Sequence, residues 1–448
     1  MFHARASSLV GARQLLVVGA AALVLVAIGL AYEPARTGAF VWDDHVLAEA
    51  DAPFRHVPLL KLLTGRFWPE GSLADPRAPY YRPIVLLSLR FDLALGDLPE
   101  DFHLTNLLLH LTACVLLAVT AARLGARAEA SLAAALLWGL APRLTESVAW
   151  ISGRTDVLAG VLGLAALALS PEIGAAPERE ARAPPTGRRW AWARSLASGA
   201  CLFGSLASKE VGLAFVAALI AGATLRPRGQ TRGRDLARLG ASIGAPVLAY
   251  AALRTIALAG KGVPSRDLGA GRRVATVLEA IARYAEMTLD ALRPRTSIGM
   301  LGEVDRTRAV IGGAMALTLL AAAAFALVRR RRLGGAPRGG SVLRVPVALG
   351  AVSIGLVVHV VPFTLAGSVT ADRLLYVPLA ALALGLAVVT SALPGPSRRA
   401  LGAAALILSI VFAGATRARA SDYRDELVFW VVAGEGAHPR NTLARSAL

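Results

Sequence analysis

The sequence predicts an all-α integral membrane protein with about eleven transmembrane helices. Hydrophobic residues make up 55% of its 448 residues and charged residues only 17%, which is more apolar than a soluble domain. Apolar stretches of about twenty residues recur along the chain, and a helix of that length can cross the hydrocarbon core of a bilayer. Basic segments alternate with these stretches, as in proteins that cross the membrane many times.

Eleven segments have the composition of membrane spans. They are residues 14–32, 103–122, 129–145, 155–170, 192–207, 210–225, 239–258, 308–328, 342–363, 372–392 and 399–416. The first is longer than the apolar region of a signal peptide and lacks a convincing small-residue cleavage site, so we expect a retained anchor. Cys114 and Cys201 both lie inside apolar stretches, so no disulfide framework is predicted.

The formal net charge of +18 does not indicate a nucleic-acid partner. Most arginines lie in short segments between apolar stretches, where they set the topology of the chain in the membrane. With a cytoplasmic N-terminus, the basic segments all fall inside: Arg5 and Arg13, Arg123 and Arg127, EREARAPPTGRR with Arg194, RPRGQTRGR, RRRR at 329–332, and Arg398 with Arg399. Residues 171–191, rich in Pro, Arg and Ala, form a predicted cytoplasmic linker. High Ala and Arg usage is typical of GC-rich bacterial genomes, so we expect a bacterial inner (cytoplasmic) membrane.

Residues 1–416 form the predicted membrane domain, and residues 417–448 a C-terminal tail on the outer side. In the first outer loop, residues 33–102, the segments FRHVPLLKLLTGRFW and YYRPIVLLSLRFDLAL carry apolar residues at helical spacing, which predicts amphipathic helices on the membrane surface. The second outer loop, residues 259–307, contains a third such helix at 275–293, which is too charged to span.

Two adjacent carboxylates, Asp43 and Asp44, follow the first span in the segment FVWDDHVLAEA. Carboxylates are costly close to hydrocarbon and often have a function there. The alternative is that the pair only begins a solvated surface helix. The pair alone does not decide between these interpretations.

Eight short motifs occur along the chain in this order: FVWDD, YYRP, FHLTNLLLH, LTESVAWISGRTD, SKE, LRPRTS, ADRLLYVP and the tail YRDELVFW…HPRNTLARSAL. In this order they resemble the membrane part of protein O-mannosyltransferase-like proteins that carry tetratricopeptide repeats. These belong to the glycosyltransferases of the GT-C fold that use polyprenyl-phosphate sugars. Two features differ: Ala141-Pro142 stands where the family usually has His-Pro, and the tail resembles the start of a truncated repeat region.

Sugar transfer from a lipid phosphate to a hydroxyl needs a base for the hydroxyl proton and cations for the phosphate leaving group. The resemblance implies that Asp43 or Asp44 is the base. Arg373 in ADRLLYVP is the first candidate for binding the donor phosphate, because a guanidinium can bind it bidentately. Arg82 in YYRP and Arg154 in SGRTD are further candidates, although an Arg beside a span is also a common interfacial anchor.

Further polar residues near the same side are candidates for lining or supporting the site: His103, Asn106, His110, Glu146, Asp156, Lys209 and Glu210. His103, Asn106 and His110 share one helix face, so they line a polar cavity or bond across helices. Lys209 and Glu210 pair with each other or face the site, and Glu146 supports the site or caps a helix. The spacing of His103, His110 and Asp43 matches no metal signature, so no metal site is predicted, and dependence on a divalent ion stays open.

The expected function is transfer of a sugar, mannose first, from a polyprenyl-phosphate carrier to Ser or Thr of exported proteins on the outer face of the membrane. Apart from this donor substrate, no cofactor is expected. Expected partners are membrane lipids, the acceptor and a separate repeat-containing protein. Alternatives are transfer to a lipid or a cell-envelope glycan, a non-catalytic scaffold, and a transporter, although no internal repeat typical of transporters is evident.

Overall fold

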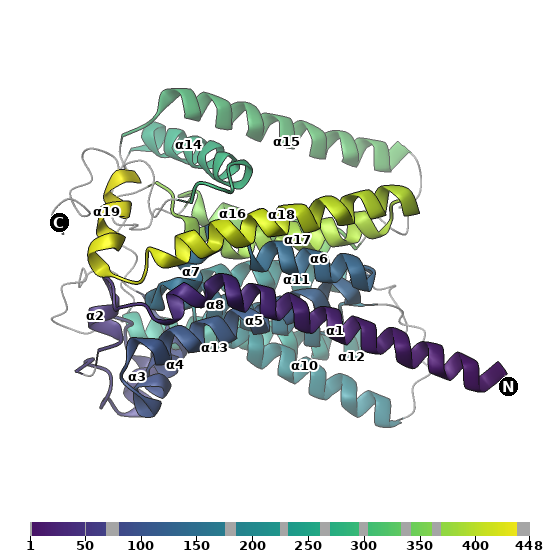
Figure 1. Cartoon of the computed structure of the whole chain (residues 1–448), viewed down its shortest axis with the longest axis horizontal. Coiled ribbons are helices and arrows are strands. Elements are labelled where there is room, and N and C mark those ends of the chain that lie inside the picture. Colours follow the sequence, from purple (N-terminus) through teal and green to yellow (C-terminus); the bar gives the residue numbers. More distant parts are fainter. Residues whose placement is uncertain are drawn as a thin grey trace.

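The computed structural model describes residues 2–49, 51–68, 80–174, 185–224, 232–259, 269–294, 303–332, 342–360 and 369–436. Every regular element in these ranges is a helix. Figure 1 shows the long helices running in roughly the same direction, with α2 (Asp44–Leu47), α3 (Leu59–Thr64) and α19 (Glu426–Gly436) at the end opposite the N-terminus. That end carries the candidate site.

The described part of each predicted span contains a helix. In chain order these are α1 (Phe2–Arg36), α5 (Pro99–Arg123), α6 (Ala128–Gly139), α8 (Arg154–Leu169), α10 (Pro185–Leu206), α11 (Leu213–Ala223), α12 (Arg232–Leu239) with α13 (Ala245–Leu258), α15 (Arg306–Arg332), α16 (Arg344–Val357), α17 (Tyr376–Ser391) and α18 (Gly395–Ser421). Within the described ranges, six segments are long and apolar enough to cross a membrane: Gln14–Arg36, Pro99–Arg123, Ile151–Leu169, Leu236–Leu258, Asp372–Ser391 and Gly395–Ser421. The chain is therefore a multi-pass membrane protein, and the count of about eleven spans stays a prediction.

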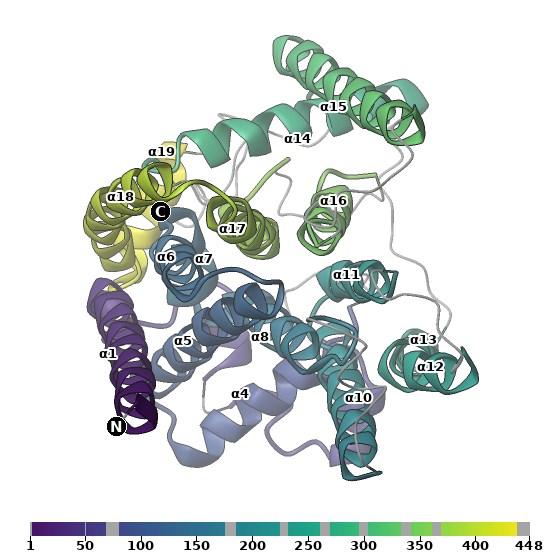
Figure 2. The ribbon, with the colours of Figure 1, turned by 90° about the vertical axis from the view of Figure 1, so that its right-hand side faces the viewer.

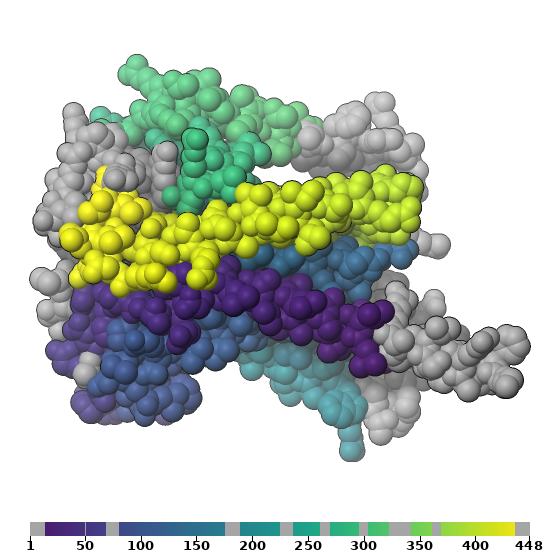
Figure 3. Space-filling view, viewed as in Figure 1, coloured from purple at the N-terminus to yellow at the C-terminus, as the bar shows by residue number. Residues whose placement is uncertain are grey.

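Helix α8 lies at the centre of the bundle and is buried over nearly its whole length. It packs against α5 and α10, and its glycines allow two further close contacts. A Cβ on Gly160 would meet the ring of Tyr376, and one on Gly163 would meet the ring of Phe215. On the outside of the bundle, α1 and α18 lie side by side along the face shown in Figure 3.

Two boundaries differ from the sequence prediction for a local reason. The third span was expected to reach residue 145, but α6 ends at Gly139. Pro142 disfavours a helical conformation in Ala141, which has φ −64° and ψ 118°. The linker predicted at 171–191 is shorter than expected, because α10 begins at Pro185, and proline is well tolerated in the first turn of a helix.

The predicted surface helices are present with altered lengths. The first contains only α3, the second is α4 (Pro83–Leu95), and the third is α14 (Ala270–Leu289). Figure 2 shows α4 and α14 running across the direction of the long helices. Their position on a membrane surface stays a prediction.

Four short connections converge at the end of the bundle that carries α2. The first leads from α1 into α2. The other three each contain a 3-10 turn: η2 (Ile151–Gly153) after α7 (Thr145–Ala149), η3 (Glu210–Gly212), and η5 (Asp372–Leu375). They contain the polar motifs of the sequence, because each motif interrupts or flanks an apolar stretch.

The crossing of α14 and α15 gives a direct test of this packing. A Cβ on Gly312 would overlap the backbone of Leu278, whereas one on Gly313 would only touch the end of the Leu278 side chain at 3.6 Å. We expect Gly312→Ala to destabilise the fold by about 1–3 kcal/mol, seen as a lower thermal unfolding midpoint in detergent. Gly313→Ala is the matched control and should keep the midpoint. Equal midpoints for the two variants would contradict this crossing.

Candidate functional site

Asp44 is a structural anchor between the first loop and the connection before α8. Its carboxylate is fully buried. Oδ1 accepts hydrogen bonds from the Ser152 backbone N–H at 2.8 Å and the Ser152 hydroxyl at 2.6 Å, and Oδ2 accepts one from the Val41 N–H at 3.2 Å. Burial raises the pKa of Asp44 to about 7, while these donors favour the ionised form. These bonds tie the segment after α1 to the connection before α8.

Asp43 is placed differently, although it is the adjacent residue. Its side chain is half-buried and accepts no hydrogen bond from the described residues. Burial raises its pKa to about 6, and the nearby Arg373 guanidinium partly opposes this shift. A carboxylate with this pKa is largely ionised at neutral pH and is a better proton acceptor than an ordinary Asp.

The backbone just before Asp43 is strained. Trp42 has φ +54°, which is uncommon for a residue other than glycine. Its indole stacks on Trp150 with ring centroids 5.1 Å apart and planes 10° from parallel, and the Trp42 backbone N–H donates to Glu426 Oε1 in α19. The stacking and the hydrogen bond hold Trp42 in this conformation, and they thereby fix the orientation of the adjacent Asp43.

Arg373 is held beside Asp43 by Glu146. The Arg373 backbone N–H donates to Glu146 Oε2 at 2.9 Å, and its guanidinium forms an ion pair with Glu146 Oε1. The guanidinium carbon lies 5.1 Å from the ring centroid of Trp150. Glu146 is almost fully buried, whereas the Arg373 side chain remains 13% exposed. One side of this arginine is thus fixed, and the remaining donors can meet a ligand.

Two more cations belong to the same charged cluster. Lys209 Nζ lies 2.6 Å from Asp156 Oδ2, and Arg82 lies 3.0 Å from Glu210 Oε2. Burial lowers the pKa of Lys209, and the neighbouring Arg82 and Arg373 charges act in the same direction, against Asp156. Repulsion of this kind is relieved when an anion binds.

Arg82 also has capacity left for a ligand. Its guanidinium carbon lies 4.3 Å from the Tyr80 ring centroid and 5.6 Å from that of Phe67. Its Nε is buried and lacks a hydrogen-bond partner among the described residues. The two rings and Glu210 hold the guanidinium in one orientation, which favours recognition of a planar or tetrahedral anion.

The structure separates Arg154 from these three cations. Arg154 is fully buried and lies 2.5 Å from Asp92 Oδ2. It also donates to Asn106 Oδ1 at 2.6 Å, Phe102 O at 2.9 Å and Ser88 Oγ at 3.1 Å. Because these donors are used inside the protein, Arg154 is a weaker candidate for binding the donor phosphate than Arg373 or Arg82.

Asn106 likewise supports the site from behind. Its amide donates to Trp150 O at 3.0 Å and Val148 O at 3.3 Å, so α5 holds the connection that carries Ser152. His110 packs in the core, with Nδ1 2.9 Å from the Tyr376 hydroxyl and Nε2 3.0 Å from Gly139 O. His103 is 3% exposed. These buried positions favour the support interpretation over cavity lining.

Sequence reasoning missed three residues that build the site. Trp42 and Trp150 form the stacked pair, and Ser152 anchors Asp44. All three lie inside the motifs quoted above, close in sequence to Asp43 or Arg154, and this position could have marked them as site residues. Ala141, where the family pattern has His, lines an apolar groove between α6, α17 and α18. Among the residues that the structure describes, no three His, Cys, Asp or Glu side chains are grouped to hold a metal ion.

Comparison with known proteins supports the resemblance seen in the motifs. No family model matches the chain. It is 28% identical over 214 residues to "Protein O-mannosyl-transferase Tmtc3" of Drosophila melanogaster, which covers 42% of this chain and 22% of that protein. It is 34% identical over 152 residues to human "Protein O-mannosyl-transferase TMTC1" (33% and 17%) and 32% identical over 202 residues to human "Protein O-mannosyl-transferase TMTC2" (44% and 23%). The chain thus spans less than a quarter of the length of these relatives.

A solved structure of ArnT from Cupriavidus metallidurans bound to undecaprenyl phosphate aligns with 97% of this chain and 78% of its own. The identity is 14% and the TM-score 0.45.

The anchoring role of Asp44 predicts different stabilities for two neighbouring variants. In Asp44→Asn, one acceptor oxygen becomes an NH₂ group, so a buried donor loses its partner, at a cost of about 1–3 kcal/mol. The thermal midpoint in detergent should fall. Asp43→Asn is the matched control and should keep or raise the midpoint, because this carboxylate accepts no such bonds. A larger loss for Asp43→Asn would reverse the two assignments.

The anchor, the stacked tryptophans and the Glu146 to Arg373 pair together place one carboxylate beside a group of cations. In sequence, the chain is similar to protein O-mannosyl-transferases of the TMTC type, which confirms the resemblance predicted from its motifs.

Proposed function

We propose that this membrane protein is a glycosyltransferase that moves mannose from a polyprenyl-phosphate carrier to Ser or Thr hydroxyls of exported proteins. The observation that carries the proposal is Asp43, a carboxylate free of hydrogen bonds from the described residues beside the partly exposed Arg373. The named activity of the relatives supports the reaction class. In this proposal the reaction occurs on the outer face of a bacterial inner membrane, with the N-terminus in the cytoplasm.

Each part of the cluster has a role in the proposed reaction. Asp43 accepts the proton of the acceptor hydroxyl, whose oxygen forms a bond to C1 of the sugar. The bond from C1 to the phosphate oxygen breaks, and the polyprenyl phosphate leaves with the electron pair. Arg373, Lys209 and Arg82 stabilise the charge that develops on the phosphate. A single displacement of this kind inverts the configuration at C1.

The carboxylates that pair with the cations are positioning residues. Glu146, Asp156 and Glu210 each hold one cation by a contact on one side. Buried cations left without partners would repel one another and would cost several kcal/mol each in desolvation. The cluster can therefore be assembled before the donor binds, which is the condition for electrostatic catalysis without reorganisation.

Replacing Asp43 tests the base directly. With polyprenyl-phosphate carrying radiolabelled mannose and a Ser/Thr-rich peptide, we expect Asp43→Asn to transfer label at least about a hundredfold more slowly than the native protein. Asp44→Asn should also slow transfer, because its anchor positions Asp43, and it differs from Asp43→Asn in its lower thermal midpoint. Full transfer by Asp43→Asn would contradict the assignment of Asp43 as the base. Label found in a lipid or glycan fraction would identify a different acceptor, and no transfer by the native protein to any acceptor would favour the scaffold alternative.

The pH dependence gives an independent check of the same residue. Transfer needs the Asp43 carboxylate, so the rate should rise with pH through about 6 and level off above it. The contribution of this group to stability has the opposite sign. Its folded-state pKa is raised, so protonation below about pH 6 stabilises the fold. Loss of activity below pH 6 should therefore occur while the Asp43 contribution to stability increases, and a flat rate profile from pH 5 to 8 would contradict the role.

A further inference from the structure

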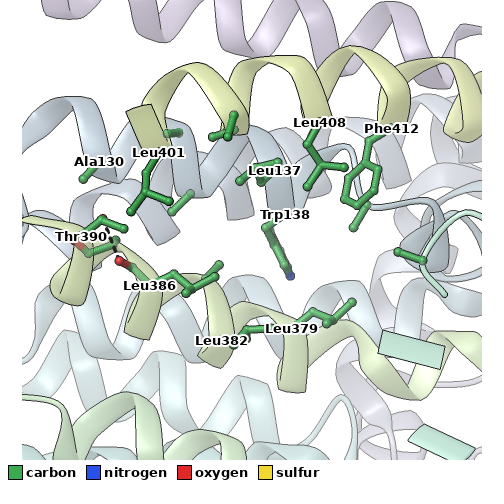
Figure 4. A pocket seen from close by; sticks show the side chains of 18 of the residues that line it. Ala130, Leu137, Trp138, Leu379, Leu382, Leu386, Thr390, Leu401, Leu408 and Phe412 are labelled. Carbon is green, nitrogen blue, oxygen red and sulfur yellow. Dashed lines mark hydrogen bonds between the residues drawn. The ribbon is translucent and has the colours of Figure 1, made fainter. Parts of the chain in front are cut away.

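Two apolar grooves lie on the outside of the bundle, apart from the charged cluster. The first runs between α6, α17 and α18, has a volume of about 430 Å³ and is shown in Figure 4. Trp138 lies between its walls, and Leu386, Leu401 and Leu408 line its sides. The second runs between α1, α6 and α18 and has a volume of about 460 Å³. Both are bordered by membrane-span candidates, so lipid is the molecule that meets them.

The two grooves share one end. The residues that line both of them are Glu129, Ala133, Gly402 and Ala405, so the grooves lie on either side of the contact between α6 and α18. Three of these four residues are small, and that leaves space between the helices. From this common end, one groove follows α17 and the other follows α1. We call the two grooves together the forked groove, and the end that carries the shared residues its mouth.

The mouth carries charges of both signs. Glu129 lies in the first turn of α6 and Arg398 in the first turn of α18, and both line the first groove. The end of α17 closes the same corner, because Ser391 Oγ accepts a hydrogen bond from the Arg127 N–H at 2.9 Å. Within the described ranges, no ion pair joins Glu129 to Arg398, and Arg398 donates to Leu393 O at 3.1 Å. Each therefore keeps charge for an external partner.

We propose that the forked groove binds one diacyl phospholipid whose head group carries a phosphate and an amine. Two grooves with one mouth match two acyl chains joined at one head group. Arg398 is placed for the phosphate and Glu129 for the ammonium group. A single isoprenoid chain would fill only one arm, and a purely anionic head group would meet the Glu129 carboxylate. Burial of the acyl chains against the apolar walls supplies the affinity.

The bound lipid would brace the helices that support the charged cluster. Trp138 in the first groove donates to Tyr376 O at 3.2 Å, at the start of α17. Arg143 at the far end of this groove pairs with Asp372 at 2.8 Å, and Asp372 is the residue before Arg373. The lipid site is thus separate from the cluster and is in contact with residues that support it.

Glycines on α18 offer a matched pair of variants. Gly402 borders both grooves, and a Cβ there meets nothing within 4 Å, so Gly402→Phe places a ring in the fork without a backbone clash. Gly414 on the same helix also has open space and lines neither groove. Gly414→Phe therefore controls for adding an aromatic ring to a lipid-facing helix.

The test uses the full chain in detergent, incubated separately with phosphatidylethanolamine, phosphatidylglycerol and polyprenyl phosphate, with bound lipid counted by native mass spectrometry. We expect one phosphatidylethanolamine per chain. Gly402→Phe should reduce its occupancy about tenfold, and Gly414→Phe should leave it unchanged. Glu129→Gln should remove the preference over phosphatidylglycerol.

Three results would overturn the proposal. Equal loss of bound lipid in Gly402→Phe and Gly414→Phe would mean that the fork is not the site. Equal binding of phosphatidylglycerol by the native chain would remove the role of the amine. Stronger binding of polyprenyl phosphate than of phospholipid, lost in Gly402→Phe, would assign the groove to the carrier.

Discussion

The hydrogen bonds between Asp44 and Ser152 fix the position on which the rest of the site depends. They tie the first loop to the connection before α8, and Asn106 and Arg154 hold that connection from behind. Because Asp43 directly precedes Asp44 in the chain, its position is set by the same bonds. Trp42, strained between the two elements, transmits this constraint through its stacking on Trp150. An adjacent pair of identical residues thus divides into one that anchors and one that is left available.

The cluster keeps several charges together in a partly buried place by pairing every cation with a carboxylate. Arg373, Lys209 and Arg82 are each only about a tenth exposed. Without partners, these three charges would repel one another and lose their hydration. Each pairing carboxylate occupies one side of its cation, and the remaining donors stay open to an anion. The same arrangement therefore stabilises the free protein and prepares it for a phosphate.

Much of this could be predicted from sequence, because a membrane imposes simple rules on it. Apolar stretches indicated the helices, and Asp43, Glu146, Lys209 and Arg373 were recognised as polar interruptions expected at one side. The contacts of these residues could not be predicted from the sequence. Asp43 and Asp44 are identical neighbours, and only the fold decides that Asp44 bonds to Ser152. Arg154 and Arg82 look equivalent in sequence, but in the structure Arg154 donates to Asn106, Phe102 and Ser88 besides pairing with Asp92, whereas the Nε of Arg82 has no partner among the described residues. The end of α6 could have been read from Pro142, whereas the positive φ of Trp42 has no sequence signal.

The central claim is that Asp43 acts on the acceptor proton while the cations hold the carrier phosphate. The most direct measurement compares the dissociation constant for polyprenyl-phosphate mannose with the single-turnover transfer rate in Asp43→Asn. The account predicts that donor binding stays within about twofold of the native value, or tightens as a nearby negative charge is lost, while transfer is lost. If donor binding weakens as much as transfer, Asp43 belongs to the donor site and its role as a base is contradicted.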